Sequence, residues 1–254
     1  MIANSYFAWS CVGLENTEFP DTYCPSCGNL LIYDRNSLYR EETSKSQPNC
    51  KDYIITCKYS CKNCNEPVIM TGIGYSENQF VIYDDPYYNK DIILYSPLFF
   101  TPTILLFDIH RKCPAKARKE IIRSFSLYWN DVDSCVNKFR LSVELLMDSQ
   151  KINKTMVHSN GKKSKYRLTL HQRIGLFKKK NQKVGEILEA IKWVGNKGSH
   201  ADNKLIVNEV IIAYELLEHA LNELYEPKKD EMYNMAKEIN KRKGHLNRKN
   251  KQWD

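Results

Sequence analysis

The sequence predicts an α+β protein in which a β-rich head precedes an all-α bundle of helices. Three observations carry this prediction. Short runs rich in Val, Ile, Tyr and Phe alternate with turn-forming residues up to about residue 100. The apolar period becomes helical after residue 106, and two Cys-x-x-Cys pairs lie within the head. We therefore expect a head over residues 1–105, a bundle over 106–227 and a basic C-terminal helix or tail over 228–254.

The head contains three runs typical of strands, "PVIMTGIGY", "QFVIYDD" and "DIILYSPLFF". The two glycines of "TGIGYS", residues 71–76, lead us to expect a turn between strands at that place. No Lys-Ser or Lys-Thr pair follows it, so this stretch is not a phosphate-binding loop.

Five amphipathic helices are expected in the bundle. Pro114 suits the first turn of a helix that ends near residue 128, and Asp131 is a candidate N-cap for the next helix, with its apolar stripe. A basic loop over 151–165 should separate these two helices from the others. The remaining helices are expected at 168–180, at 184–194 with Gly195 at its end, and at 207–225.

The cysteines Cys24 and Cys27, and Cys61 and Cys64, form two pairs separated by 33 residues. Each pair can direct two thiolates at one tetrahedral Zn²⁺ through a tight turn. The spacing predicts a zinc ribbon whose four thiolates close the metal to water, so that the zinc stabilises the head and takes no part in catalysis. Two alternatives stay open: Cys57 as a substitute ligand, and a set of buried free thiols.

The formal net charge of +8 is concentrated in residues 149–185, which hold eleven Lys and Arg and no Asp or Glu. Such a segment predicts a phosphate-binding surface for a nucleic acid. The expected contacts are Lys162, Lys163, Lys165, Arg167, Arg173, Lys178, Lys179 and Lys180. A second basic cluster, at 241–251, is interpreted as a solvated tail.

A membrane protein is not expected, because the longest uncharged run, residues 92–107, is broken by Pro97 and Pro102. The first residues lack a basic stretch followed by an apolar core, so we also expect no secretory signal. These two features favour a cytoplasmic protein with reduced thiols.

The order of the cysteine pairs, "FRLSVELL", "LHQRIGLF" and "IKWVGNKGSH" resembles the bacterial domain of unknown function 4145 over residues 24–225. That family is similar to the HEPN superfamily of helical bundles. The resemblance implies a place near restriction and phage-defence systems and a homodimer in which two copies of the last motif meet. In HEPN ribonucleases, which need no metal, an Arg steadies the phosphate and a His assists attack by the ribose 2′-hydroxyl.

On this chain His200 and Asn196 match the HEPN motif, whereas Gly195 stands where the Arg is expected. Lys192 lies one helical turn earlier on the same face, and with Arg140 it could replace the missing cation, although Lys lacks the bidentate fork of Arg. Arg140 and Glu144, spaced i, i+4, are interpreted as a polar ion pair inside the bundle. The alternative for the motif is a helix-ending turn with a structural His.

Three functions are kept open. The leading hypothesis is a dimeric, non-catalytic or weakly catalytic module that binds nucleic acid through the basic segment, with RNA as the expected nucleic acid. The second is a metal-independent ribonuclease that uses His200. The third is a protein–protein adaptor in a defence or restriction complex, in which the zinc head holds the partner.

Overall fold

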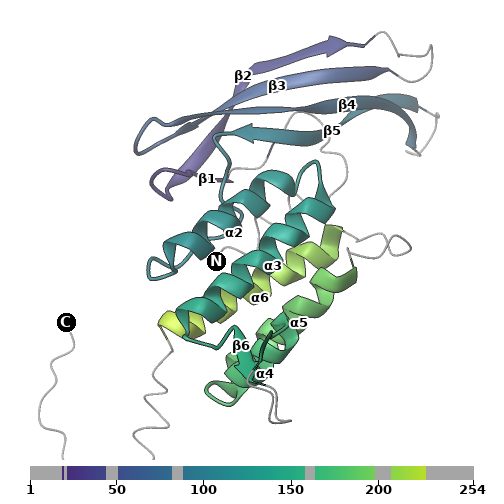
Figure 1. Ribbon diagram of the computed structural model, residues 1–254. Coiled ribbons are helices and arrows are strands. Elements are labelled where there is room, and N and C mark those ends of the chain that lie inside the picture. The colour runs from purple at the N-terminus through teal and green to yellow at the C-terminus, as the bar shows by residue number, and fades with distance from the viewer. Residues whose placement is uncertain are drawn as a thin grey trace, which may run out of the picture.

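The computed structural model describes residues 19, 22–43, 51–81, 88–157, 164–197 and 207–226, without the side chains at 77–81, 88–92, 194–197 and 207–208. It has the predicted α+β architecture, an N-terminal antiparallel sheet followed by helices (Figure 1). The strands of the sheet are β1 (Thr22–Tyr23), β2 (Leu30–Glu42), β3 (Asp52–Cys61), β4 (Pro67–Val81) and β5 (Tyr88–Thr101). The helices are α2 (Ala115–Leu127), α3 (Val132–Ser149), α4 (Leu170–Lys178), α5 (Gln182–Lys197) and α6 (Val207–Tyr225).

The strands pair in chain order, each antiparallel to the next. Side chains alternate between the two faces of such a sheet. On β3, Ile55, Cys57 and Tyr59 are buried, whereas Ile54, which directly precedes Ile55, is exposed. The buried face forms the core of the head with aromatic side chains of the neighbouring strands, such as Tyr33 on β2.

The expectation of a turn at "TGIGYS" is wrong, because these residues lie inside β4. A bulge falls between Thr71 and Gly72 in the pairing with β5. A Cβ at Gly72 would collide with the carbonyl oxygen of Ser96, and one at Gly74 would meet the ring of Tyr95 at 3.0 Å. The glycines therefore allow β4 and β5 to approach each other closely. Close approach of another backbone is one of the reasons why glycine occurs inside strands.

The starts of three helices follow from local chemistry. Helix α2 begins directly after Pro114, and the Asp131 carboxylate caps α3 by accepting from the backbone N–H of Ser134 at 2.9 Å, as predicted. Thr169 and Gln172 form a capping box at the start of α4. Each cap satisfies backbone N–H groups that have no partner inside the helix.

Two predicted boundaries in the bundle are wrong. Helix α5 continues through Gly195 to Lys197, since one glycine inside a packed helix costs only about 1 kcal/mol. The expected basic loop over 151–165 contains part of a two-stranded ribbon, β6 (Thr155–Val157) paired with β7 (Lys165–Arg167). Short alternating runs of three residues give too weak a period to be recognised in sequence.

The sheet and the helices form two apolar cores that meet at Trp129, whose side chain packs against both. Its ring lies 4.9 Å from that of Phe100 on β5, and Asn130 donates from Nδ2 to the carbonyl of Leu98 at 3.0 Å. Figure 1 shows the sheet lying over one end of the bundle, with α4 and the β6–β7 ribbon at the opposite end. No helix in the described ranges is long and apolar enough to cross a membrane.

Candidate functional site

The four paired cysteines meet where two turns of the sheet come together. Cys24 and Cys27 lie in the β1–β2 connection, whereas Cys61 is the last residue of β3 and Cys64 lies in the β3–β4 connection. All four sulfur atoms are within 4.8 Å of one another. The Sγ of Cys24 is 3.6 Å from that of Cys64, and the Sγ of Cys27 is 3.4 Å from that of Cys61. The sheet therefore gathers four thiols that are far apart in sequence.

The two turns have the same backbone design. The N–H of Gly28 donates to the carbonyl of Cys24 at 2.9 Å, and the N–H of Asn65 donates to the carbonyl of Cys61 at 3.1 Å. Gly28 and Asn65 both have positive φ angles, 73° and 58°. Gly and Asn are the residues that adopt this left-handed conformation most readily. Each Cys-x-x-Cys pair thus ends in a residue suited to folding the chain back toward the sulfurs.

The geometry fits a tetrahedral metal ion. With metal–sulfur bonds of about 2.3 Å, neighbouring sulfurs of a tetrahedral site are about 3.8 Å apart, close to the separations of the described thiols. Hydrogen bonds from the backbone and side chain of Asn29 lower the pKa of the Cys27 thiol to about 6. In the same group a backbone hydrogen bond from Glu66 lowers the pKa of the Cys64 thiol, but burial and hydrogen bonds with the neighbouring cysteines outweigh it and raise that pKa to about 12. Metals bind the thiolate form, so a bound ion would displace the proton of Cys64.

Cys57 does not belong to this group. The metal-compatible group found among the described residues consists of the four paired cysteines, while Cys57 lies inside the core of the head. Burial raises the pKa of its thiol to about 12, so it keeps its proton and packs as a small apolar side chain. The alternative ligand set that includes Cys57 is therefore not what the fold assembles.

The basic segment is partly neutralised by acids from other helices, which sequence distance concealed. Arg173 is only 5% exposed and donates from Nη2 to Asp148 Oδ1 at 2.6 Å. Lys178 pairs with Glu189 at 2.6 Å. Arg173 is therefore buried and Lys178 is paired, so neither is a free surface cation, and their role as phosphate contacts stays a prediction. Lys154 and Lys183 likewise pair with acids, Asp148 and Glu223 respectively.

Five cations of the segment are exposed and form no ion pair with any described acid. They are Lys151, Lys165, Arg167, Lys179 and Lys180. Lys180 donates from Nζ to the carbonyl of Gln150 at 3.4 Å, which brings the end of α4 beside the end of α3. The other two expected contacts, Lys162 and Lys163, lie outside the described residues. We call the five described cations the distal basic surface, because their elements lie at the end of the bundle away from the sheet (Figure 1).

Arg140 and Glu144 line one pocket on α3, and the ion pair between them stays a prediction. Arg140 also contributes to the environment of Lys192 on α5. Burial, followed by the nearby charge of Arg140, lowers the pKa of Lys192, and Glu189 opposes this shift. The Lys192 Nζ lies 3.4 Å from the centre of the Trp193 ring, so its charge faces an aromatic surface.

The structure brings together only part of the predicted catalytic set. Arg140 and Lys192 are electrostatic neighbours across α3 and α5. Asn196 lies in α5, with a side chain that is not described, and His200 lies outside the described residues. The geometry of a His200 site is therefore not part of the described structure.

Sequence reasoning missed an apolar surface on the outer face of the sheet. Five large side chains there are between 44% and 57% exposed, namely Tyr39, Ile54, Ile69, Ile73 and Phe99. Ile54 is the register partner of Ile73, and Phe99 that of Thr71. The signal was present in β3, where Ile54 and Ile55 are adjacent. Neighbouring residues on a strand face opposite sides, so two consecutive isoleucines place one on each face.

Comparison with protein families gives a match to the Domain of unknown function (DUF4145) over residues 123–249. The match begins inside α2, so the sheet and the cysteine group precede it. No curated protein and no solved structure matches the chain. With half of its residues matched by that family model, this protein is a member of the DUF4145 family.

Proposed function

We propose that this protein is an RNA-binding module whose sheet is stabilised by a structural zinc ion. Cys24, Cys27, Cys61 and Cys64 supply four thiolates from two turns of matching design. A tetrahedral four-thiolate site suits Zn²⁺ and leaves no open position for water. The zinc then joins the β1–β2 and β3–β4 turns and takes no part in chemistry.

The observation that carries RNA binding is the distal basic surface. Lys151, Lys165, Arg167, Lys179 and Lys180 remain exposed, without acid partners in the described chain, although four other cations of the same segment are paired. Uncompensated cations gathered at one end of a molecule attract a polyanion. The choice of RNA over DNA rests on the resemblance to HEPN bundles, as do a homodimer and a role in defence.

The test measures binding to single-stranded RNA by fluorescence anisotropy at several salt concentrations. The slope of log affinity against log salt should shrink by about 0.7 for each phosphate that the protein no longer neutralises. The variant Lys179→Ala/Lys180→Ala should weaken binding and reduce the slope. The matched control Lys116→Ala/Lys119→Ala removes two exposed lysines from α2. It should leave both the RNA affinity and the slope unchanged. Equal effects of the two variants would contradict the assignment of the surface.

A protein–protein adaptor is the second candidate, and the apolar outer face of the sheet favours it. Contiguous exposed apolar side chains on a sheet commonly mark a protein interface. The partner would cover Ile54, Ile73 and Phe99, which lie on three neighbouring strands. This function predicts that the protein co-purifies with a stoichiometric protein partner and without nucleic acid. The partner should be lost in Ile73→Asp and retained in Lys179→Ala/Lys180→Ala. The opposite pattern supports RNA binding.

A further inference from the structure

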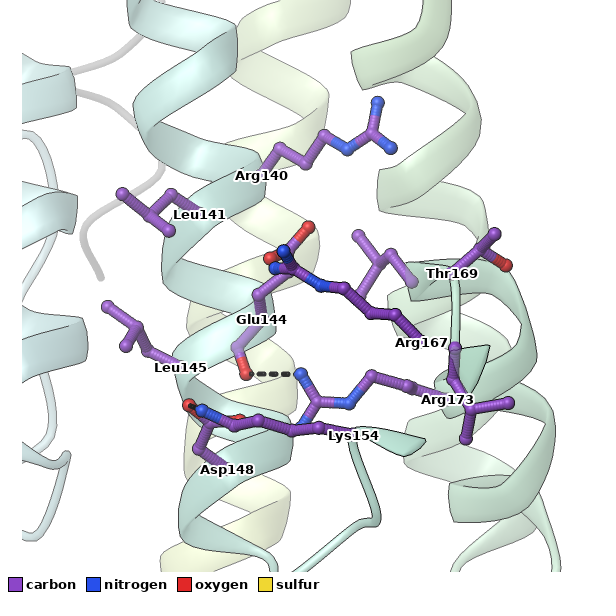
Figure 2. A pocket seen from close by; sticks show the side chains of 11 residues that line it. Arg140, Leu141, Glu144, Leu145, Asp148, Lys154, Arg167, Thr169 and Arg173 are labelled. Atoms are coloured by element: carbon purple, nitrogen blue, oxygen red, sulfur yellow. Dashed lines mark hydrogen bonds and ion pairs between the residues drawn. The ribbon is translucent and has the colours of Figure 1, made fainter. Parts of the chain in front are cut away.

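A pocket of about 460 Å³ opens between α3, the β6–β7 ribbon and the start of α4. Figure 2 shows arginines reaching it from three elements, Arg140 on α3, Arg167 on β7 and Arg173 on α4. A volume of this size can enclose a small organic ligand. The sequence does not predict this pocket, although it identifies Arg140 and Glu144 as a polar pair and Arg167 and Arg173 as phosphate contacts.

The pocket has an excess of positive charge. Four of its lining residues are cations, Arg140, Lys154, Arg167 and Arg173, and two are acids, Glu144 and Asp148, which leaves a formal charge of +2. A partly enclosed cluster of this kind repels itself unless it meets an anion. The excess therefore points to a ligand that carries about two negative charges.

Asp148 is fully engaged by the fold and does not cancel the remaining cations. It accepts from Arg173 Nη2 at 2.6 Å and from Lys154 Nζ at 2.7 Å. Although burial acts in the opposite direction, hydrogen bonds from Lys154 and Arg173 hold the pKa of Asp148 below its usual value. Arg173 also donates to the carbonyls of Glu144 and Ile152. It is therefore a rigid, buried part of the pocket floor.

Two cations of the cluster, Lys154 and Arg167, are exposed, and of these Arg167 forms no ion pair with a described acid. It stands at the end of β7, where the ribbon meets the start of α4. Thr169 caps that helix, so the positive end of the α4 dipole adds to the field at the same place. An anionic group at the pocket mouth would meet the guanidinium of Arg167, whose planar fork suits a phosphate.

The rest of the pocket lining favours a ligand that has an apolar part and a hydrogen-bond donor in addition to its negative charge. Leu141, Leu145 and Leu168 provide an apolar wall, against which a flat organic group can pack. Glu144 is half-buried in the same lining, and its carboxylate can only accept hydrogen bonds when ionised. A fitting ligand therefore combines a dianion, an apolar ring and a hydrogen-bond donor.

We infer that this pocket binds a nucleoside monophosphate, with the phosphate at Arg140 and Arg167, the base against Leu141 and Leu145, and a ribose hydroxyl donating to Glu144. The nucleotide could be free or could be the 5′-phosphorylated end of an RNA strand, since the chemistry is the same. Binding of a free nucleotide does not depend on the proposed RNA function, whereas binding of a strand end rests on it.

The experiment is isothermal titration calorimetry of the full chain with AMP, adenosine, dAMP and inorganic phosphate. We expect AMP to bind more tightly than adenosine or phosphate alone. Arg167→Gln should weaken AMP binding by about tenfold, because a charged hydrogen bond to the phosphate is removed. The control Lys116→Gln removes one charge from an exposed position on α2, outside the pocket lining and the distal basic surface, and should leave AMP affinity unchanged.

A second variant tests the ribose contact. Glu144→Gln should reduce the preference for AMP over dAMP while binding inorganic phosphate more tightly, because one negative charge is removed. Each of three outcomes would overturn the inference: adenosine binding as tightly as AMP, no binding of AMP at millimolar concentration, or equal losses of AMP affinity in Arg167→Gln and Lys116→Gln.

Two RNA strands distinguish the sources of the nucleotide. A 5′-phosphorylated strand that binds more tightly than its 5′-hydroxyl twin, with the difference abolished in Arg167→Gln, assigns the pocket to strand ends. AMP binding without any difference between the strands assigns it to free nucleotides. Failure of the distal basic surface would appear separately, as unchanged RNA affinity in Lys179→Ala/Lys180→Ala.

Discussion

Replacement of the buried Arg173 by methionine should destabilise the bundle more than any other single change of a cation in the basic segment. Arg173 is 5% exposed, and its guanidinium donates three hydrogen bonds that tie α4 to α3 and to the chain after α3. Methionine fills much of the same volume and donates none. The variant therefore leaves the carbonyls of Glu144 and Ile152 without this donor and removes one of the two cations at Asp148.

The magnitude follows from the partners that remain. Removing one member of a buried ion pair costs about 3–5 kcal/mol when the other charge is stranded. Asp148 is not stranded, because Lys154 stays 2.7 Å away and the Asp148 side chain is 28% exposed. We therefore expect a loss near the lower limit, about 3 kcal/mol, from one charged and two carbonyl hydrogen bonds. For a chain of this size the midpoint of thermal unfolding should fall by about 6–12 °C.

Urea unfolding followed by circular dichroism measures this loss, with Lys154→Met as the matched control. Lys154 pairs with the same carboxylate, but its side chain is 64% exposed, so its loss should cost less than about 1 kcal/mol. Equal and small losses of unfolding free energy in the two variants would refute the reasoning. They would mean that the buried ion pair of Arg173 stabilises the fold no more than the exposed ion pair of Lys154.

The pH dependence gives a second readout. Burial raises the pKa of Asp148 in the folded state, but hydrogen bonds donated by Lys154 and Arg173 outweigh it and lower the pKa from its ordinary 3.8. Stability from this group is therefore complete above the unfolded pKa and is lost as the pH falls through the lower folded pKa. The difference in the free energy of unfolding between the wild type and Arg173→Met should accordingly become smaller below about pH 4.

Three further predictions test the cysteine centre and the HEPN motif. Cys64→Ala should lose bound zinc in elemental analysis of the purified protein, whereas Cys57→Ala should retain it, because Cys57 lies in the apolar core. Chelation of the zinc should lower the thermal unfolding midpoint of the wild type, since metal binding to the folded state is lost, and an unchanged midpoint would exclude a structural role. RNA incubated with EDTA should be bound but not cut. Cleavage that disappears in His200→Ala would instead identify a ribonuclease in which Lys192 or Arg140 replaces the missing Arg.

The sequence by itself determined the features that arise from short-range chemistry. The β-rich head, the Asp131 cap and the bounds of α6 follow from patterns within a few residues of one another. The two Cys-x-x-Cys pairs also identified the four thiols that meet, because each pair already supplies half of a tetrahedral shell. Family membership was recognisable from the helical motifs, and the match covers these motifs but not the head.

Only the tertiary structure decided which charges are free to act. In sequence, residues 149–185 have no acid, yet Asp148, Glu189 and Glu223 form ion pairs with four of their cations once the helices pack. The same packing placed Arg140, Arg167 and Arg173 around one pocket. It also made "TGIGYS" part of a strand, because the need for glycine came from β5 rather than from a turn. Contacts between side chains distant in sequence fix charge compensation and close backbone approach, and no local pattern records those distances.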